Sequence, residues 1–209
     1  MRFYDCSTAP SPRRTRILFA EKGLEIETIQ VDLATGEQLG DAYRAINPRC
    51  TVPALQLDDG TVLSENLAIA SYIEDTHPDP PLFGTTPTER AQVLEWNSRV
   101  EMEGLMAVAE VLRNSSKRME NRALPGPLDV PQIPELAERG RLRLGHFFQV
   151  LDDRLADREH LAIDAFSLAD ITAFVVVDFA RWVKATPTPE QTHLTAWFER
   201  TSSRPSTQA

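Results

Sequence analysis

Residues 47–55, NPRCTVPAL, and residues 63–69, LSENLAI, decide the fold. In the first segment Pro53 directly precedes a run that otherwise reads as a buried strand, where proline is rarely found. A cis peptide bond is one way to fit it, and a trans proline that opens the strand is the alternative. With the cis bond, the backbone N–H and C=O of Val52 face outward and are free to pair with the extended backbone of a peptide.

The second segment begins a helix directly after a strand, with Glu65 and Asn66 in its first turn. The free N–H groups of a helix start bind carboxylates, and Glu65 supplies the opposite charge for an ammonium group. Together these residues predict a receptor for the α-amino and α-carboxylate groups of an amino acid. The alternative is structural: Ser64 caps the helix, and Glu65 favours the helix dipole.

The pattern of the chain changes near residue 80, where residues 76–90, THPDPPLFGTTPTER, carry four prolines and a glycine between regular segments. We therefore predict two domains, residues 1–80 and residues 87–209. The first has a βαβ order and then a ββα order, separated by a polar stretch without a predicted element. Its predicted strands are residues 2–5, 27–32, 54–57 and 62–63, and its predicted helices are residues 12–22 and 65–75. The second domain shows helical periodicity alone, over residues 88–112, 134–155, 168–184 and 190–201.

Composition excludes several classes of function. The chain has 22 Lys and Arg against 31 Asp and Glu, and its net charge of -9 repels nucleic-acid phosphates and anionic lipid surfaces. The first ten residues turn polar too early for a secretory signal, and the most apolar run, residues 173–177, is too short to span a membrane. Two cysteines, Cys6 and Cys50, provide neither a disulfide framework nor metal-ligand spacing. We expect a cytoplasmic protein without a metal, a nucleic-acid partner or a membrane partner.

Residues 166–171, FSLADI, predict a capping box in the second domain. Ser167 is its N-cap and Asp170 reaches back to it, while Phe166 and Ile171 form the hydrophobic staple. The helix that follows is apolar nearly all round, which is typical of a helix in the core of a domain.

Four segments in the same order and spacing resemble the soluble glutathione transferases: YDCSTAPSPRRTRILFAEKGLE, NPRCTVPAL, LSENLAI and SLADITAF. The resemblance covers nearly the whole chain. It implies an α/β thioredoxin-like N-terminal domain that binds glutathione, followed by an all-α C-terminal domain that contributes the pocket for a second substrate. It also implies a homodimer, with glutathione as co-substrate and no other cofactor.

The resemblance also implies how glutathione is held. The Val52 backbone and a cis Pro53 bind its peptide, while Glu65 and its neighbour Asn66 bind its amino-acid end. Family members usually have a serine where this chain has Asn66, and an asparagine still donates to a carboxylate and still suits a helix start.

The group that activates the thiol departs from the family pattern. In serine-type members a hydroxyl residue stands just before the proline that precedes the first helix, and here Ala9 occupies that position. We predict Ser11 as the catalytic hydroxyl, donating to the thiolate of glutathione. The alternative is that Ser11 is the N-cap of a helix that starts at Pro12. Cys6 is either a core residue or a thiol that forms a mixed disulfide with glutathione.

The predicted function is conjugation of the glutathione thiolate to a small apolar electrophile, a detoxification reaction. Arg99, Met102 and Met106 recur at helical spacing and form a candidate electrophile-binding stripe, with core methionines as the alternative. Two rival functions remain. One is glutathione-dependent reduction of disulfides or peroxides, and the other is a non-catalytic glutathione-binding module, which Ala9 suggests.

Overall fold

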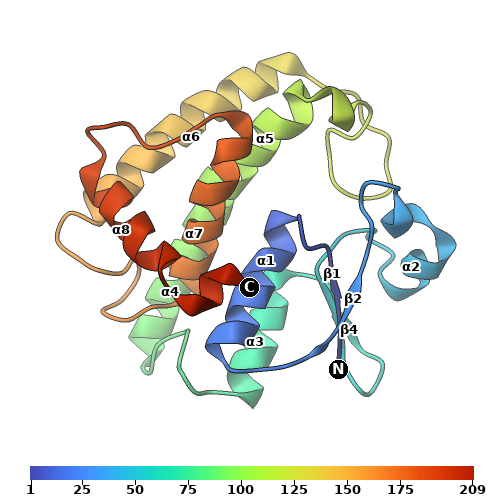
Figure 1. Ribbon diagram of the computed structural model, residues 1–209, viewed down its shortest axis with the longest axis horizontal. Coiled ribbons are helices and arrows are strands. Elements are labelled where there is room, and N and C mark those ends of the chain that lie inside the picture. The colour runs from blue at the N-terminus through green and yellow to red at the C-terminus, as the bar shows by residue number, and fades with distance from the viewer. The chain divides into compact units, whose positions relative to one another are not determined.

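The structure, a computed structural model, describes residues 1–209 and divides into two compact units (Figure 1). The first unit comprises residues 1–80 with residues 124–128 and 209, and the second comprises residues 81–123 and 129–208. The chain passes from one unit to the other within the proline-rich segment that follows residue 76. None of its helices combines the length and the apolar character that a membrane span requires.

The first unit begins with a βαβ element. β1 (Arg2–Asp5) and β2 (Glu27–Gln30) pair in parallel, and α1 (Pro10–Glu21) connects them. Successive side chains of a strand point to opposite faces of the sheet, so β1 contributes to two packing layers. Phe3 packs edge-on against Phe19 of α1, with ring centroids 5.1 Å apart.

A ββα element completes the sheet in the order β2-β1-β3-β4. β3 (Ala54–Gln56) pairs antiparallel with β1, and β4 (Val62–Leu63) pairs antiparallel with β3. α3 (Asn66–Thr76) follows and packs beside α1. The observed element order agrees with the prediction, and the strand and helix ends differ by one or two residues.

The second face of the sheet is covered by an element that the sequence did not predict. α2 (Asp41–Ile46) places Tyr43 against Tyr4, with ring centroids 5.9 Å apart, in a cluster that includes Val31 and Ala54. α2 is six residues long and buries only Tyr43, so it has no apolar repeat for a periodicity argument to detect.

The ends of α1 and α3 are joined by a buried ion pair. Lys22 Nζ lies 2.6 Å from Glu74 Oε2, and the exposed fractions of the two side chains are 0% and 6%. The same ammonium donates to the carbonyls of Pro78 at 3.2 Å and Pro80 at 2.6 Å. A buried charge is tolerated when it is paired and hydrogen-bonded, and here it fixes the segment that follows α3.

The second unit is all helical. Its long helices are α4 (Pro87–Arg99), α5 (Met106–Ser115), α6 (Pro134–Arg154), α7 (Leu168–Ala180) and α8 (Thr192–Ser202). A π-helical turn, Val100–Leu105, joins α4 to α5, so the long helix predicted over residues 88–112 is interrupted by a wider turn. Gly104 lies in this turn, and a Cβ atom there would approach the Phe147 ring to 2.4 Å.

α7 forms the core of the second unit, as predicted, with every residue buried except Asp178. The predicted capping box at its start is present. Asp170 accepts hydrogen bonds from Ser167 N–H, Ser167 Oγ, Leu161 N–H and the Trp197 indole N–H, at 2.8–3.3 Å. Burial raises the pKa of Asp170, and the hydrogen bonds from Leu161 and Ser167 oppose part of that rise. One carboxyl group thus joins the start of α7 to the preceding loop and to α8.

We predict that Asp170→Ala lowers the free energy of unfolding by about 3 to 5 kcal/mol, because it leaves several buried donors without an acceptor. Urea unfolding followed by circular dichroism measures the change. Asp178→Ala is the matched control on the same helix and should cost less than about 0.5 kcal/mol, because this residue is not buried. Equal losses in the two variants would contradict this role for Asp170.

Candidate active site

The first part of the site is the backbone of Val52. The Val52–Pro53 peptide bond is cis, as the resemblance implied, and Pro53 is buried just before β3. Neither the N–H nor the C=O of Val52 takes part in a backbone hydrogen bond of the chain. Both groups are therefore open to pair with an extended ligand backbone.

The loop before Val52 is fixed by side chains from α2 and its end. The Tyr43 hydroxyl donates to the Thr51 carbonyl at 2.7 Å, and Asn47 Nδ2 donates to the same carbonyl at 2.8 Å. Asn47 Oδ1 also accepts from the Arg49 N–H at 3.1 Å, and its carbonyl accepts from the Cys50 N–H at 2.9 Å. Cys50 is buried and has a φ of 55° in this tight turn.

The second part is the start of α3. The helix begins at Asn66, and Glu65 is its N-cap residue, without a capping hydrogen bond from a side chain. The alternative in which Ser64 caps the helix is therefore wrong. The Glu65 carboxylate lies 3.0 Å from Arg49 Nη2, and the exposed fractions of the Arg49 and Glu65 side chains are 67% and 64%. Such an exposed pair is weak, so Glu65 can exchange its partner for a ligand ammonium.

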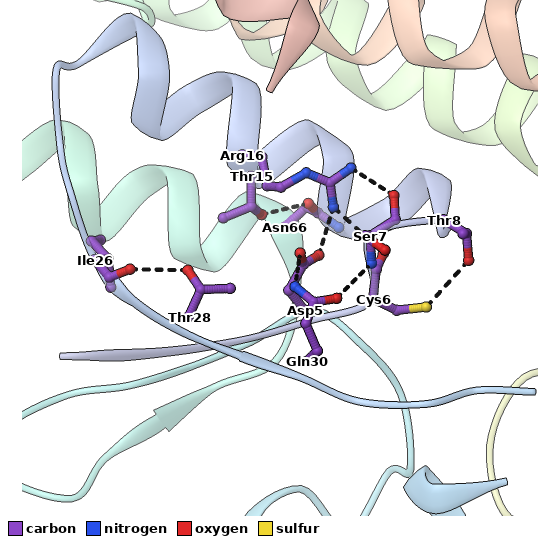
Figure 2. Close-up of polar contacts among 10 residues, drawn as sticks. All are labelled: Asp5, Cys6, Ser7, Thr8, Thr15, Arg16, Ile26, Thr28, Gln30 and Asn66. Atoms are coloured by element: carbon purple, nitrogen blue, oxygen red, sulfur yellow. Dashed lines mark hydrogen bonds and ion pairs between the residues drawn. The ribbon is translucent and has the colours of Figure 1, made fainter. Parts of the chain in front are cut away.

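Asn66 connects the starts of α3 and α1. Its side chain lies against Thr15 at 2.9 Å (Figure 2). With the amide nitrogen facing its acceptors, Nδ2 donates to the Ser11 carbonyl and to Thr15 Oγ1, both at 2.9 Å, and Oδ1 accepts from Arg14 at 2.9 Å. The amide thus has internal partners. The N–H groups of the first α3 turn remain, because the first helical hydrogen bond runs from Ile69 to Glu65.

The third part is the start of α1. The helix begins at Pro10 with Ala9 as its N-cap residue, so Ser11 is the second helical residue and the N-cap alternative for Ser11 is wrong. Pro10 and Pro12 have no N–H, so Ser11 alone offers a backbone donor among these three residues. Arg14 Nη2 donates to Ser11 Oγ at 3.4 Å, which leaves the hydroxyl proton available to another acceptor.

Polar contacts that the sequence analysis missed hold the loop between β1 and α1 (Figure 2). Arg16 Nη1 and Gln30 Nε2 donate to the two oxygens of Asp5, at 2.6 and 2.7 Å. Gln30 also accepts from the Ser7 N–H at 2.9 Å, and Arg16 donates to the Ser7 carbonyl at 3.1 Å. Asp5 and Gln30 meet because β1 and β2 pair in this register, which no local sequence signal reveals. Cys6 on this loop is buried, as a core residue would be.

The structure brings the predicted parts of the first unit together. Asn66 contacts Ser11, its neighbour Glu65 pairs with Arg49, and Arg49 lies three residues before Val52. The start of α1, the start of α3 and the loop before β3 therefore form one connected site.

The predicted electrophile-binding stripe lies on the second unit. The Arg99 guanidinium lies 4.4 Å from the centre of the Trp96 ring and 3.2 Å from Glu103 Oε1. Met102 and Met106 have exposed fractions of 62% and 44%, so the alternative that they are core methionines is wrong for the isolated chain. The π-helical turn presents Met102 at the surface while Gly104 faces Phe147.

Comparison with known proteins decides the family. Residues 8–76 match the glutathione S-transferase N-terminal domain, and residues 105–205 match the glutathione S-transferase C-terminal domain. The chain belongs to the glutathione S-transferase family. Glutathione S-transferase 2 of Saccharomyces cerevisiae is 34% identical over 209 residues, which cover 99% of this chain and 87% of the yeast protein.

Solved structures of glutathione S-transferases agree with this fold. A glutathione S-transferase domain-containing protein of Marinobacter aquaeolei has a TM-score of 0.91 at 35% identity, covering 99% of this chain and 100% of its own. Gtt2 of Saccharomyces cerevisiae has a TM-score of 0.90 at 34% identity, and the match covers 100% of this chain and 99% of the Gtt2 chain. The predicted family, fold and enzyme class are confirmed.

Proposed function

We propose that this glutathione S-transferase conjugates the thiolate of glutathione to an electrophilic carbon of a small apolar substrate. The observation that carries the proposal is the connected site of the first unit. It presents a free backbone at Val52, an exposed carboxylate at Glu65 and a hydroxyl at Ser11. These are the groups that an extended peptide with a free amino-acid end and a thiol requires.

Each part of glutathione has a proposed partner. The γ-glutamyl ammonium binds Glu65 in place of Arg49, and the neighbouring carboxylate binds the free N–H groups at Asn66 and the next residue. The Asn66 side chain then acts through the contact between α1 and α3, because its amide is already hydrogen-bonded. The cysteinyl backbone pairs with Val52 beside Pro53, which directs the thiol toward the start of α1.

Thiol activation rests on Ser11. A cysteine thiol has a pKa of about 8.5, so it is mostly protonated at neutral pH, and each unit of lowering requires about 1.4 kcal/mol. The backbone N–H and the hydroxyl of Ser11 give two donors for the thiolate, and Arg14 adds positive charge nearby. We expect these groups to lower the pKa of the bound thiol by about one to two units.

The second substrate is assigned to the helical unit. Exposed methionines offer a flexible apolar surface, so Met102 and Met106 suit an apolar electrophile, and Arg99 can orient a polar group on it. We place the enzyme in the cytoplasm, with detoxification as its role. Its partners are glutathione and the electrophile, without nucleic acid, membrane or metal.

We predict a two-fold symmetric homodimer, because the resemblance implies one and the first unit is small enough to gain stability from burying a further face. Sedimentation at micromolar protein concentration should give about twice the mass of the chain. A monomer under these conditions would contradict the prediction.

We predict that Glu65→Ala weakens glutathione binding by about 2 to 3 kcal/mol without unfolding the protein, because the ligand ammonium loses a charge-assisted bond. Titration calorimetry measures the loss. Asn66→Ala should weaken glutathione binding less than Glu65→Ala.

Glu27→Ala is the matched control for Glu65→Ala. Glu27 is also an exposed carboxylate paired with an arginine, at 3.2 Å from Arg2, and its exposed fraction is 61%. It lies on β2, away from the groups proposed to bind glutathione. Unchanged glutathione affinity in Glu65→Ala, or an equal loss in both variants, would refute the assignment of Glu65.

We predict that Ser11→Ala raises the pKa of bound glutathione and lowers kcat with an aryl halide by roughly tenfold to a hundredfold, with glutathione affinity nearly unchanged. A hydroxyl that donates to the thiolate stabilises only the ionised form, so its loss affects ionisation and rate rather than binding. An absorbance titration of the bound thiolate and steady-state kinetics measure both effects.

Cys6→Ala is the companion variant and should change the rate far less. Glutathione-dependent reduction requires a reactive protein thiol or a second thiol at the site, and both cysteines of this chain are buried. If Cys6→Ala abolishes activity, Ser11→Ala spares it and hydroxyethyl disulfide is turned over, the reductase function replaces conjugation. Tight glutathione binding without turnover of any electrophile would favour a non-catalytic binding module.

A further inference from the structure

We propose that Tyr43 is a positioning residue for glutathione. With Asn47 it holds the Thr51 carbonyl inside the protein and thereby directs the Val52 N–H toward the ligand. The inference rests on the proposed function and assigns a role to α2, the helix that covers the second face of the sheet.

The geometry of one peptide group carries the inference. The Thr51 carbonyl and the Val52 N–H belong to the same peptide unit, and this bond is trans, because the cis bonds of the chain are Val52–Pro53 and Asp79–Pro80. In a trans peptide unit the C=O and the N–H point in opposite directions. A carbonyl held toward the interior therefore turns the Val52 N–H outward.

Two donors from buried side chains hold that carbonyl. The Tyr43 hydroxyl lies 2.7 Å from the Thr51 oxygen and Asn47 Nδ2 lies 2.8 Å from it, so both lone pairs of the oxygen have a donor. Tyr43 is 4% exposed and Asn47 is 2% exposed. Water therefore has little access with which to replace either donor.

Tyr43 is itself held firmly. Its ring packs edge-on against Tyr4 in the cluster between α2 and the sheet, and this cluster includes Val31 and Ala54. Burial raises the pKa of Tyr43 to about 12. The hydroxyl therefore stays protonated at neutral pH and remains a donor to the Thr51 carbonyl.

The test is Tyr43→Phe, which removes one donor and keeps the packing of the ring. We expect the Kd for glutathione to rise about fivefold to tenfold, because the Val52 N–H must then be oriented on binding, at a cost of about one hydrogen bond. The KM for an aryl halide and kcat at saturating glutathione should stay unchanged, because neither Ser11 nor the electrophile side is altered. Titration calorimetry and steady-state kinetics measure these values.

Tyr4→Phe is the matched control. Tyr4 is 6% exposed, belongs to the same cluster and donates its hydroxyl to Gln56 Oε1 at 3.2 Å, not to the Thr51 carbonyl. Both variants therefore remove a tyrosine hydroxyl from the same cluster. We expect its Kd for glutathione to remain that of the wild type.

A second measurement is independent of glutathione. The amide resonance of Val52 in the free protein should shift in Tyr43→Phe and stay in place in Tyr4→Phe. An unchanged Val52 resonance, a wild-type Kd in Tyr43→Phe, or an equal loss of affinity in both variants overturns the inference. Failure of the wild-type protein to bind glutathione instead overturns the proposed function, and the Val52 resonance still decides whether Tyr43 orients this peptide group.

Discussion

The peptide carbonyl of Thr51 has two hydrogen-bond donors from buried side chains, and α2 and the loop before β3 are arranged around these two hydrogen bonds. α2 supplies Tyr43, and the residue after this helix, Asn47, supplies the second donor. The side chain of Tyr43 is also part of the core on this face of the sheet. The packing of α2 therefore fixes the conformation of the loop before β3. That conformation leaves the backbone of Val52 without a hydrogen bond to the chain.

The starts of α1 and α3 form the other half of the site, and they depend on a single amide. The Asn66 side chain forms hydrogen bonds with Ser11, Thr15 and Arg14. These bonds fix the two helix starts against each other. The two prolines of the first α1 turn leave Ser11 as its donor of both an N–H and an O–H. In the second unit, too, one polar side chain joins several elements, because Asp170 accepts hydrogen bonds from four donors around the start of α7.

The errors of sequence interpretation have physical causes. α2 was missed because one buried residue in six produces no period. The turn Val100–Leu105 was missed because an i→i+5 turn leaves an apolar pattern that still resembles an α-helix over this length. The alternatives in which Ser11 and Ser64 cap their helices are wrong because each helix starts a residue or two away from the position that local capping preferences indicate.

The sequence by itself determined the βαβ and ββα order, the helical second part, the capping box at Ser167 and the family, because these features depend on local pattern and motif spacing. It also selected Val52, Glu65 and Ser11 as candidate site residues. Only the tertiary structure decided which donors hold the Thr51 carbonyl, and that the Asn66 side chain faces α1. Such contacts join residues 4 to 55 positions apart, and their hydrogen-bond geometry exists only once the loop conformation, strand register and helix packing have brought those residues together.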